Sequence, residues 1–129
     1  MEPLLLVEDK IELRAMLRKA LERNGFRVEE APDGSAAIQK IRAKRYQMVV
    51  TDLKMPGASG LDVLRESKQA DSTIPVILLT ALARKLLGSD TALAEGFLSK
   101  PCSLDELLDA IVDPTLSRIR RPAEEAASW

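Results

Sequence analysis

Hydrophobic positions follow two patterns that alternate along the chain. Short apolar runs with little interruption are typical of strands that are buried on both faces of a sheet. Such runs occupy residues 4–7, 48–51, 76–80 and 97–99. Elsewhere, apolar residues recur at the spacing of a helix with one buried face. This helical spacing covers residues 13–21, 37–41, 61–68 and 104–112.

Two further segments modify this picture. Residues 26–30 alternate apolar with charged side chains, which predicts a strand with one exposed face, at an edge of the sheet. Residues 82–95 have helical character, but Gly88 and Ser89 interrupt them. The helix predicted there is therefore weak or broken.

Polar residues and one glycine mark the expected ends of the helices. Gly25 stands where the first helix should stop. Asp33 and Ser59 are expected to cap the second and third helices. Ser103 and Glu106 have the spacing of a capping box before the last helix.

Five strands that alternate with five helices predict an α/β fold. We expect a flavodoxin-like, doubly wound (βα)5 domain whose five-stranded parallel sheet has the order 2-1-3-4-5 and helices on both faces. This order puts the segment 26–30 at the edge. We expect one domain over residues 1–113, followed by a polar tail or the start of a linker at 114–129.

Composition narrows the possible chemistry. The 129 residues include no histidine and one cysteine, Cys102, which excludes histidine-ligated metals, serine–histidine triads and an intramolecular disulfide. The formal net charge of −1 favours neither direct nucleic-acid binding nor a membrane partner, and the arginines at 118, 120 and 121 are expected in a solvated end. No apolar run approaches the ~20 residues that cross a bilayer, and we expect a cytoplasmic protein.

Five polar residues come at the ends of the predicted strands. They are Glu8, Asp9, Asp52, Thr80 and Lys100. The carboxyl ends of parallel strands meet at one rim, where such sheets bind ligands, so these side chains should gather there. Each alone has a simpler explanation, such as a helix cap, a turn residue, a strand residue or a solvated amine. Their common position favours a functional site, and the Pro-Gly turn after Asp52 is expected to leave its carboxylate accessible.

The residue types in this set indicate phosphoryl chemistry. Two carboxylates roughly 4 Å apart repel by about 4 kcal/mol at an effective dielectric constant of about 20, so three of them need shared protons, a cation or a nearby ammonium group. Oxygen ligands without histidine or cysteine fit Mg²⁺ (or Mn²⁺). Together with Lys100 and the Thr80 hydroxyl they form a receptacle for a phosphoryl group, which an aspartate can accept covalently.

Four motifs carry a resemblance to a known family. They are LLLVED at 4–9, VVTDLKMPGASGLDVL at 49–64, VILLTA at 76–81 and FLSKPCSLDELL at 97–108. With the rhythm of strands and helices, they make residues 3–112 resemble the receiver domain of two-component response regulators, including receivers fused to hybrid sensor kinases. The resemblance implies the same fold and a conformational switch that phosphorylation operates.

The resemblance also implies roles for the acidic residues. Asp52 would be the phosphoacceptor. Asp9 and Asp52 would bind Mg²⁺ directly, together with the backbone carbonyl of Lys54, and Glu8 would act largely through a bound water. Such a domain catalyses its own phosphorylation and dephosphorylation, and is a stoichiometric phosphoacceptor and not a turnover enzyme.

Further roles follow for the phosphate-binding and switch residues. Thr80, the backbone amide of Ala81 and Lys100 would hold the phosphoryl oxygens. Phe97 stands at the family's aromatic switch position, although a plain core aromatic is the simpler explanation. Glu95 and Gly96 run directly into Phe97, so the segment between Thr80 and Lys100 is shorter than is common in receivers. This segment belongs to the face that receivers usually use to bind partners and to form dimers.

The implied phosphodonor is a sensor histidine kinase or a histidine phosphotransfer protein, and the implied output is a partner, an attached domain or a homodimer. The alternative is a phosphorylation-independent interaction module on the same fold, which would not need the costly cluster of acids. A flavin-binding relative is disfavoured, because no glycine-rich loop follows the first strand and aromatic residues make up only 3% of the chain.

Overall fold

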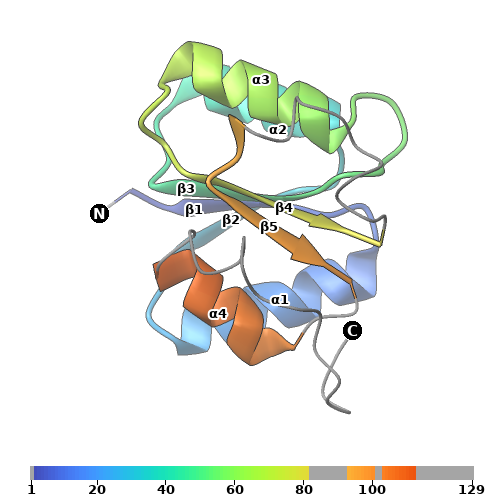
Figure 1. Ribbon diagram of the computed structural model, residues 1–129, viewed down its shortest axis with the longest axis vertical. Helices are drawn as coiled ribbons and strands as arrows, with labels where there is room; N and C mark the ends of the chain where they lie inside the picture. Colours follow the sequence, from blue (N-terminus) through green and yellow to red (C-terminus); the bar gives the residue numbers. More distant parts are fainter. Residues whose placement is uncertain (1, 82–92, 101–102, 113–129) are drawn as a thin grey trace.

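The strands form a parallel sheet between two layers of helices (Figure 1). The computed structural model describes residues 2–81, 93–100 and 103–112. Within these residues the strands are β1 (Leu4–Val7), β2 (Val28–Ala31), β3 (Met48–Asp52), β4 (Val76–Thr80) and β5 (Gly96–Ser99). The described helices are α1 (Ile11–Arg23), α2 (Gly34–Ala43), α3 (Gly60–Ala70) and α4 (Leu104–Val112).

The predicted fold class is confirmed. All neighbouring strands pair in parallel, and their order is β2-β1-β3-β4-β5. The helices α2 and α3 cover one face of the sheet, and α1 and α4 cover the other (Figure 1). No helix in the described part of the chain is both long enough and apolar enough to span a bilayer.

The apolar runs reflect these two covered faces. Successive strand side chains point to opposite faces, so a strand between two helical layers has no solvent side. In β1, Leu5 and Val7 pack into the core under α2 and α3, whereas Leu4 and Leu6 pack into the core above α1 and α4. All four are fully buried.

The edge strand β2 is where the alternating pattern predicted it, but it starts later. The strand begins at Val28 and not at residue 26. Phe26 still belongs to the exit from α1, because its backbone N–H donates to the Leu21 carbonyl at 3.1 Å. The two acidic residues of β2 are paired: Glu29 with Lys40 and Lys44, and Glu30 with Arg14 and Arg18.

The predicted helix ends are confirmed where the structure describes them. Asp33 Oδ1 accepts the Ala36 N–H at 2.8 Å, and Ser59 forms a full capping box with Asp62. Ser103 Oγ accepts the N–H of Glu106 at 3.1 Å, which is the first of the two hydrogen bonds of the predicted capping box. Gly25 follows α1 with a φ of 91°, a conformation that favours glycine.

The weak helix predicted at 82–95 lies mostly outside the described residues, which resume at Leu93. The helix labelled α4 is therefore the last helix expected from the sequence. The predicted tail at 114–129 and Cys102 also lie outside the described residues.

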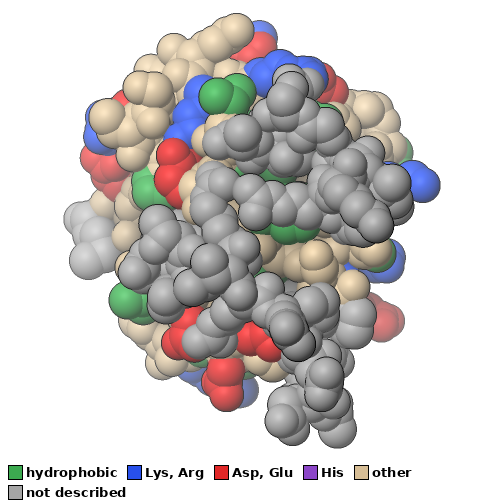
Figure 2. All heavy atoms as spheres, in the orientation of Figure 1, with side chains coloured by type: hydrophobic (Ala, Val, Ile, Leu, Met, Phe, Trp, Pro, Cys, Tyr) green, Lys and Arg blue, Asp and Glu red, His purple; other side chains and the backbone are tan. Residues whose placement is uncertain are grey.

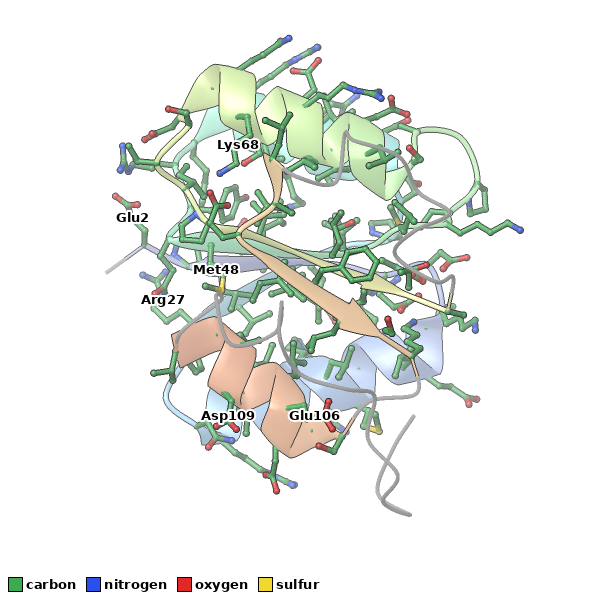
Figure 3. The ribbon with its side chains drawn as sticks, in the orientation of Figure 1. Glu2, Arg27, Met48, Lys68, Glu106 and Asp109 are labelled. Atoms are coloured by element: carbon green, nitrogen blue, oxygen red, sulfur yellow. The ribbon has the colours of Figure 1, made fainter. Side chains whose placement is uncertain are left out.

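A half-buried lysine fastens α3 to the sheet far from the strand ends that carry the acids. Lys68 Nζ lies 2.7 Å from both carboxylate oxygens of Glu95, and it also donates to the carbonyls of Ser72 and Ile74. Glu95 Oε1 in turn accepts the Val76 N–H at 2.9 Å. Figure 3 shows Lys68 pointing from α3 toward the start of β5. This contact joins α3 to the beginnings of β4 and β5.

Candidate functional site

Three carboxylates meet at the carboxyl ends of the two central strands. Glu8 and Asp9 follow β1, and Asp52 is the last residue of β3. One carboxylate oxygen from each lies within 4.8 Å of the others. Glu8 is 1% exposed and Asp52 is 8% exposed, so most of this negative charge is held away from bulk water.

Lys100 brings a positive charge to two of these acids. Its Nζ lies 3.4 Å from Glu8 Oε1 and 3.5 Å from Asp52 Oδ2. The backbone N–H of Lys100 donates to the Thr80 carbonyl at 2.6 Å, which holds the Lys100 backbone beside the end of β4. The ammonium group therefore reaches the acids from the side of the sheet formed by β4 and β5.

Asp52 is less accessible than the turn after it suggests. Its Oδ1 accepts the N–H of Leu53 at 2.9 Å, and Lys100 lies beside Oδ2. The expectation of an accessible carboxylate is therefore wrong for the side chain as a whole, because the backbone and the lysine cover it. Thr51 also donates its hydroxyl to the Asp52 carbonyl at 2.9 Å, which fixes the backbone at this point.

Burial raises the pKa of the Glu8 carboxyl above its ordinary value, because the charged form loses solvation there. The Lys10 N–H, which donates to Glu8 Oε2 at 3.1 Å, opposes this rise. The nearby Asp52 charge raises the pKa further, and the Lys100 charge lowers it. Arg14 Nη1 donates to the Glu8 carbonyl at 2.8 Å and so holds α1 against this loop.

The predicted switch residues share one face of the sheet. Thr80 ends β4 and is 2% exposed, and it is paired with Ser99 of β5. Phe97 is paired with Leu78 and is 5% exposed in the core under α2 and α3. Since Leu78 and Thr80 are two residues apart on one strand, the Thr80 and Phe97 side chains lie on the same face. Each of the two residues also interacts with other parts of the chain.

Two predicted backbone contributors lie in the loops around the site. Lys54 follows β3 by two residues and is exposed, and Ala81 follows Thr80 directly and is also exposed. Their side chains are thus not in the core. Their proposed contributions are a carbonyl oxygen and an N–H group, which do not depend on the side chain.

Gly60 is a residue that sequence reasoning missed. A Cβ atom at this position would lie 2.4 Å from the Asp52 carbonyl oxygen and 2.7 Å from Leu53 Cα. The Gly60 N–H donates to the Leu53 carbonyl at 2.8 Å. The start of α3 is therefore pressed against the Asp52 backbone. The signal in the sequence is a glycine directly after the capping Ser59, where the helical backbone does not itself require one.

The donor set fits a hard divalent cation. Three carboxylates and one ammonium group leave a net charge of −2 when all are ionised. Among the described residues the cluster offers oxygen ligands from Glu8, Asp9 and Asp52. Mg²⁺ is bound by a few carboxylates and several waters, which suits a site at the end of a sheet.

Comparisons with known proteins show the family of the chain. The family model "Response regulator receiver domain" matches residues 4–112. The transcriptional regulatory protein TctD of Salmonella typhimurium is 41% identical over 107 residues, which cover 81% of this chain and 47% of that protein. The response regulator MprA of Mycobacterium ulcerans is 35% identical over 127 residues, which cover 96% of this chain and 54% of that protein. The chain thus spans about half the length of these relatives.

Solved structures show the same likeness. The response regulator protein TrrA of Thermotoga maritima, in complex with Mg²⁺-BeF, superposes with a TM-score of 0.80 at 29% identity and covers 87% of this chain and 97% of that chain. The structure of the histidine kinase ThkA in complex with TrrA gives a TM-score of 0.78 at 29% identity, over 87% of this chain and 97% of that one. The chain belongs to the receiver-domain family of two-component response regulators.

Proposed function

We propose that Asp52 accepts a phosphoryl group from a phosphohistidine and that the domain then changes its interaction with an output partner. The donor would be a sensor histidine kinase or a histidine phosphotransfer protein. The observation that carries this proposal is the contact of Lys100 with both Glu8 and Asp52, beside the cluster of three carboxylates. The complex of TrrA with the kinase ThkA supports a histidine kinase as the class of partner.

The transfer step would use the Asp52 oxygen that lies beside Lys100. Oδ1 is held by the Leu53 N–H, so Oδ2 is the oxygen that would attack phosphorus. A P–O bond to Oδ2 forms while the P–N bond of the donor breaks, and the donor imidazole leaves with the electron pair and takes up a proton. Lys100 would then move its ammonium group from Oδ2 to the phosphoryl oxygens, which Thr80 and the Ala81 N–H would also bind.

The acids would hold the divalent cation. Asp9, Asp52 and the backbone carbonyl of Lys54 would bind Mg²⁺ (or Mn²⁺) directly, and Glu8 would act through a bound water. When bound, the ion neutralises charge that develops on the phosphoryl oxygens. Support comes from the net negative charge of the cluster and from the Mg²⁺-BeF complex of TrrA.

The switch would run through the shared face of Thr80 and Phe97. Movement of the Thr80 hydroxyl toward the phosphoryl group would free space beside Phe97 and change the burial of its ring. Couplings of this kind are typically about 1–3 kcal/mol, which changes partner affinity by about 5- to 150-fold. The domain would also hydrolyse its own phosphoaspartate, so each phosphorylation is one signal and not one turnover.

We further propose residues 1–113 as the receiver domain and 114–129 as a polar tail or the start of a linker. The end of the family match at residue 112 supports this boundary. The output would be a partner protein, an attached domain or a second copy of the receiver. The transcriptional regulatory relatives, about twice as long as this chain, support an attached domain as one of these forms.

A phosphodonor experiment tests the acceptor. The chain is incubated with acetyl phosphate and Mg²⁺, and its intact mass is measured over time. We expect one added phosphoryl group, no adduct with Asp52→Asn, and an unchanged adduct with Asp105→Asn, which alters an exposed acid of α4. An equal adduct on the Asp52→Asn chain would show that another group is the acceptor.

A separate measurement tests the cation site without phosphorylation. Mg²⁺ that binds only the folded chain at 100 times its dissociation constant should add about 2.7 kcal/mol to the free energy of unfolding. Urea denaturation with and without Mg²⁺ measures this gain. We expect Asp9→Asn to remove most of it and Asp105→Asn to retain it. An equal gain in all three chains would contradict a site at these acids.

A further inference from the structure

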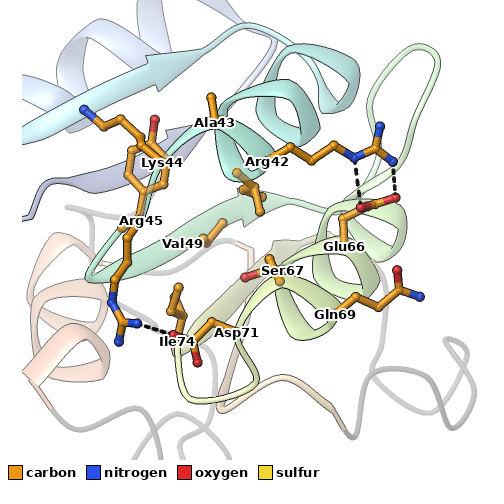
Figure 4. Close-up of a pocket in the computed structure, with 13 residues that line it drawn as sticks. Arg42, Ala43, Lys44, Arg45, Val49, Glu66, Ser67, Gln69, Asp71 and Ile74 are labelled. Atoms are coloured by element: carbon orange, nitrogen blue, oxygen red, sulfur yellow. Dashed lines mark hydrogen bonds and ion pairs between the residues drawn. The ribbon is translucent and has the colours of Figure 1, made fainter.

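A pocket of about 560 Å³ lies between the last turns of α2 and α3, at the amino ends of β3 and β4. It is at the opposite end of the sheet from Asp52. Figure 4 shows its side chains, with Val49 and Ser67 between two rim ion pairs, Arg42–Glu66 and Arg45–Asp71. The volume is in the range of pockets that bind small organic molecules.

The floor of this pocket is apolar. It includes Ile41, Val49 and Ile74, which are at most 7% exposed, and the buried Tyr46. The Tyr46 hydroxyl donates to Glu29 Oε1 at 2.8 Å, so the polar end of this ring is already satisfied. The floor therefore suits a flat hydrocarbon or aromatic group.

One polar atom in this lining lacks a partner. Ser67 is 0% exposed, and its Oγ has no hydrogen-bond partner among the residues that the structure describes. A buried hydroxyl without a hydrogen bond is unusual, because its desolvation is not compensated. Ser67 lines the pocket, so a bound molecule can supply the missing hydrogen bond.

Each cation of the rim is paired with an acid: Arg42 with Glu66, Lys44 with Glu29, and Arg45 with Asp71. Arg42, Lys44 and Arg45 line the rim against Glu66 and Asp71. Arg42 uses Nε and Nη2 toward Glu66, and Arg45 uses Nη1 toward Asp71 and Nε toward Glu2. Their remaining Nη atoms are outside these ion pairs. A guanidinium group that an acid already orients presents its other N–H donors to a second carboxylate in a fixed geometry.

From these three features we propose that the pocket binds a small amphipathic organic anion, with a planar apolar body and one carboxylate. The apolar body lies on the floor formed by Val49, Ile74 and Tyr46. The carboxylate lies at the rim with Arg42 or Arg45, and a polar atom of the ligand bonds to Ser67. This site is separate from the acidic cluster, and its test does not depend on phosphorylation of Asp52.

The test uses the full chain with nitrogen-15 labelling and titration by 3-phenylpropionate. We expect saturable shifts at the amides of Val49, Ser67 and Ile74, within about 10 mM ligand, which is the affinity range of a ligand this small. The uncharged analogue 3-phenylpropanamide and the small anion acetate should each bind about tenfold more weakly, since each lacks one half of the recognition.

Variants separate the contributions. Ser67→Ala removes the hydroxyl at nearly constant volume, and Ser67→Cys, whose thiol is only a weak donor, serves the same purpose if the alanine variant does not fold. Each should weaken 3-phenylpropionate by about fivefold. Arg45→Gln alters an exposed rim residue and should weaken it by about tenfold. Arg65→Gln, on an exposed part of α3 outside the pocket, should leave the affinity unchanged.

Three results would overturn the proposal. One is the absence of saturable shifts at the pocket amides. The second is equal affinity for the acid and the amide, which would indicate a purely apolar site for a side chain of another protein. The third is an affinity that is unchanged in both Ser67 and Arg45 variants, which would place the ligand elsewhere.

Discussion

The two ends of the sheet differ in how far their charged side chains are paired. At the carboxyl ends of β1 and β3, three carboxylates lie together, and one ammonium group contacts two of them. At the amino ends, each acid has a basic partner: Glu29 pairs with Lys44, Asp71 with Arg45 and Glu95 with Lys68. One end therefore keeps an excess of negative charge, while the other is neutralised within the chain.

This difference separates function from stability within one small domain. Uncompensated buried charge costs free energy, so a cluster of this kind indicates a functional site. Paired charge at the other end holds α2, α3 and the edge strand together. The helix α3 touches both ends, because Gly60 meets the Asp52 backbone and Lys68 meets Glu95.

The largest expected effect comes from filling the space at Gly60. In Gly60→Ala the added Cβ would meet the backbone of Asp52 and Leu53, which cannot move aside as a flexible side chain does. We expect a loss of about 3 kcal/mol in the free energy of unfolding, measured by urea denaturation.

The matched control is Gly25→Ala at the amino end, where φ is 91° and no atom lies within 4 Å of the added Cβ. It should cost about 1–2 kcal/mol from backbone strain alone. Equal losses would refute the close contact at Gly60.

The next effect concerns the neutralised end. Lys68→Met removes the ammonium group but retains much of the side-chain volume, and the Glu95 carboxylate loses its ion pair with Lys68. The carbonyls of Ser72 and Ile74 lose a donor as well. We expect a loss of about 2 kcal/mol, because hydrogen bonds to charged groups are stronger than neutral ones. Lys19→Met, on an exposed part of α1, is the control and should change stability little.

At the acidic end, removal of a charge should raise the free energy of unfolding. Asp52→Asn removes one of three mutually repelling charges, and in metal-free buffer we expect a gain of about 1 kcal/mol. At the neutralised end, Glu95→Gln should instead lose stability, since it breaks the pair with Lys68. Parallel urea denaturation of the two variants measures both signs. A loss in Asp52→Asn without metal would mean that its contact with Lys100 outweighs the repulsion.

The smallest effect is a contrast in pH dependence. The hydrogen bond from Lys44 holds the pKa of Glu29 below its ordinary value of 4.5. Its stabilisation is therefore present above pH 4.5 and is lost as the pH falls through the lowered pKa. Burial raises the pKa of Glu8, so its ionisation costs stability as the pH rises from 4.5 through the raised value.

Two variants measure this contrast in metal-free buffer. The stability difference between wild type and Glu29→Gln should become more favourable to wild type as the pH rises toward neutrality. The difference for Glu8→Gln should become less favourable to wild type over the same rise. Curves of the same slope for both variants would contradict the difference between the two ends.

The sequence allowed the acidic end to be predicted because strand order alone brings it together. Once five parallel strands and their order are known, residues that follow the strands must meet at one rim. Glu8, Asp9, Asp52 and Lys100 needed no further information. The degree of burial of Asp52 was not predictable in this way, because it depends on how Lys100 and Leu53 cover the carboxylate.

The neutralised end and the pocket could not be predicted from strand ends. Lys68 and Glu95 are 27 residues apart, and their pairing depends on the packing angle of α3. Ser67 occupies an ordinary helical position, and only the packed structure shows that its hydroxyl lacks a partner among the described residues. Gly60 likewise has an ordinary backbone conformation, so its role follows from the proximity of Asp52 and not from its φ.

The edge strand β2 has a consequence for crowding. An exposed strand edge can pair with the edge of another molecule and start aggregation. In β2, Glu29 and Glu30 are each engaged by two basic side chains from α1, α2 and the segment after α2. An incoming strand would meet a charged edge of only four residues. Many copies of the domain can therefore stand at high local concentration without joining sheet to sheet along this edge.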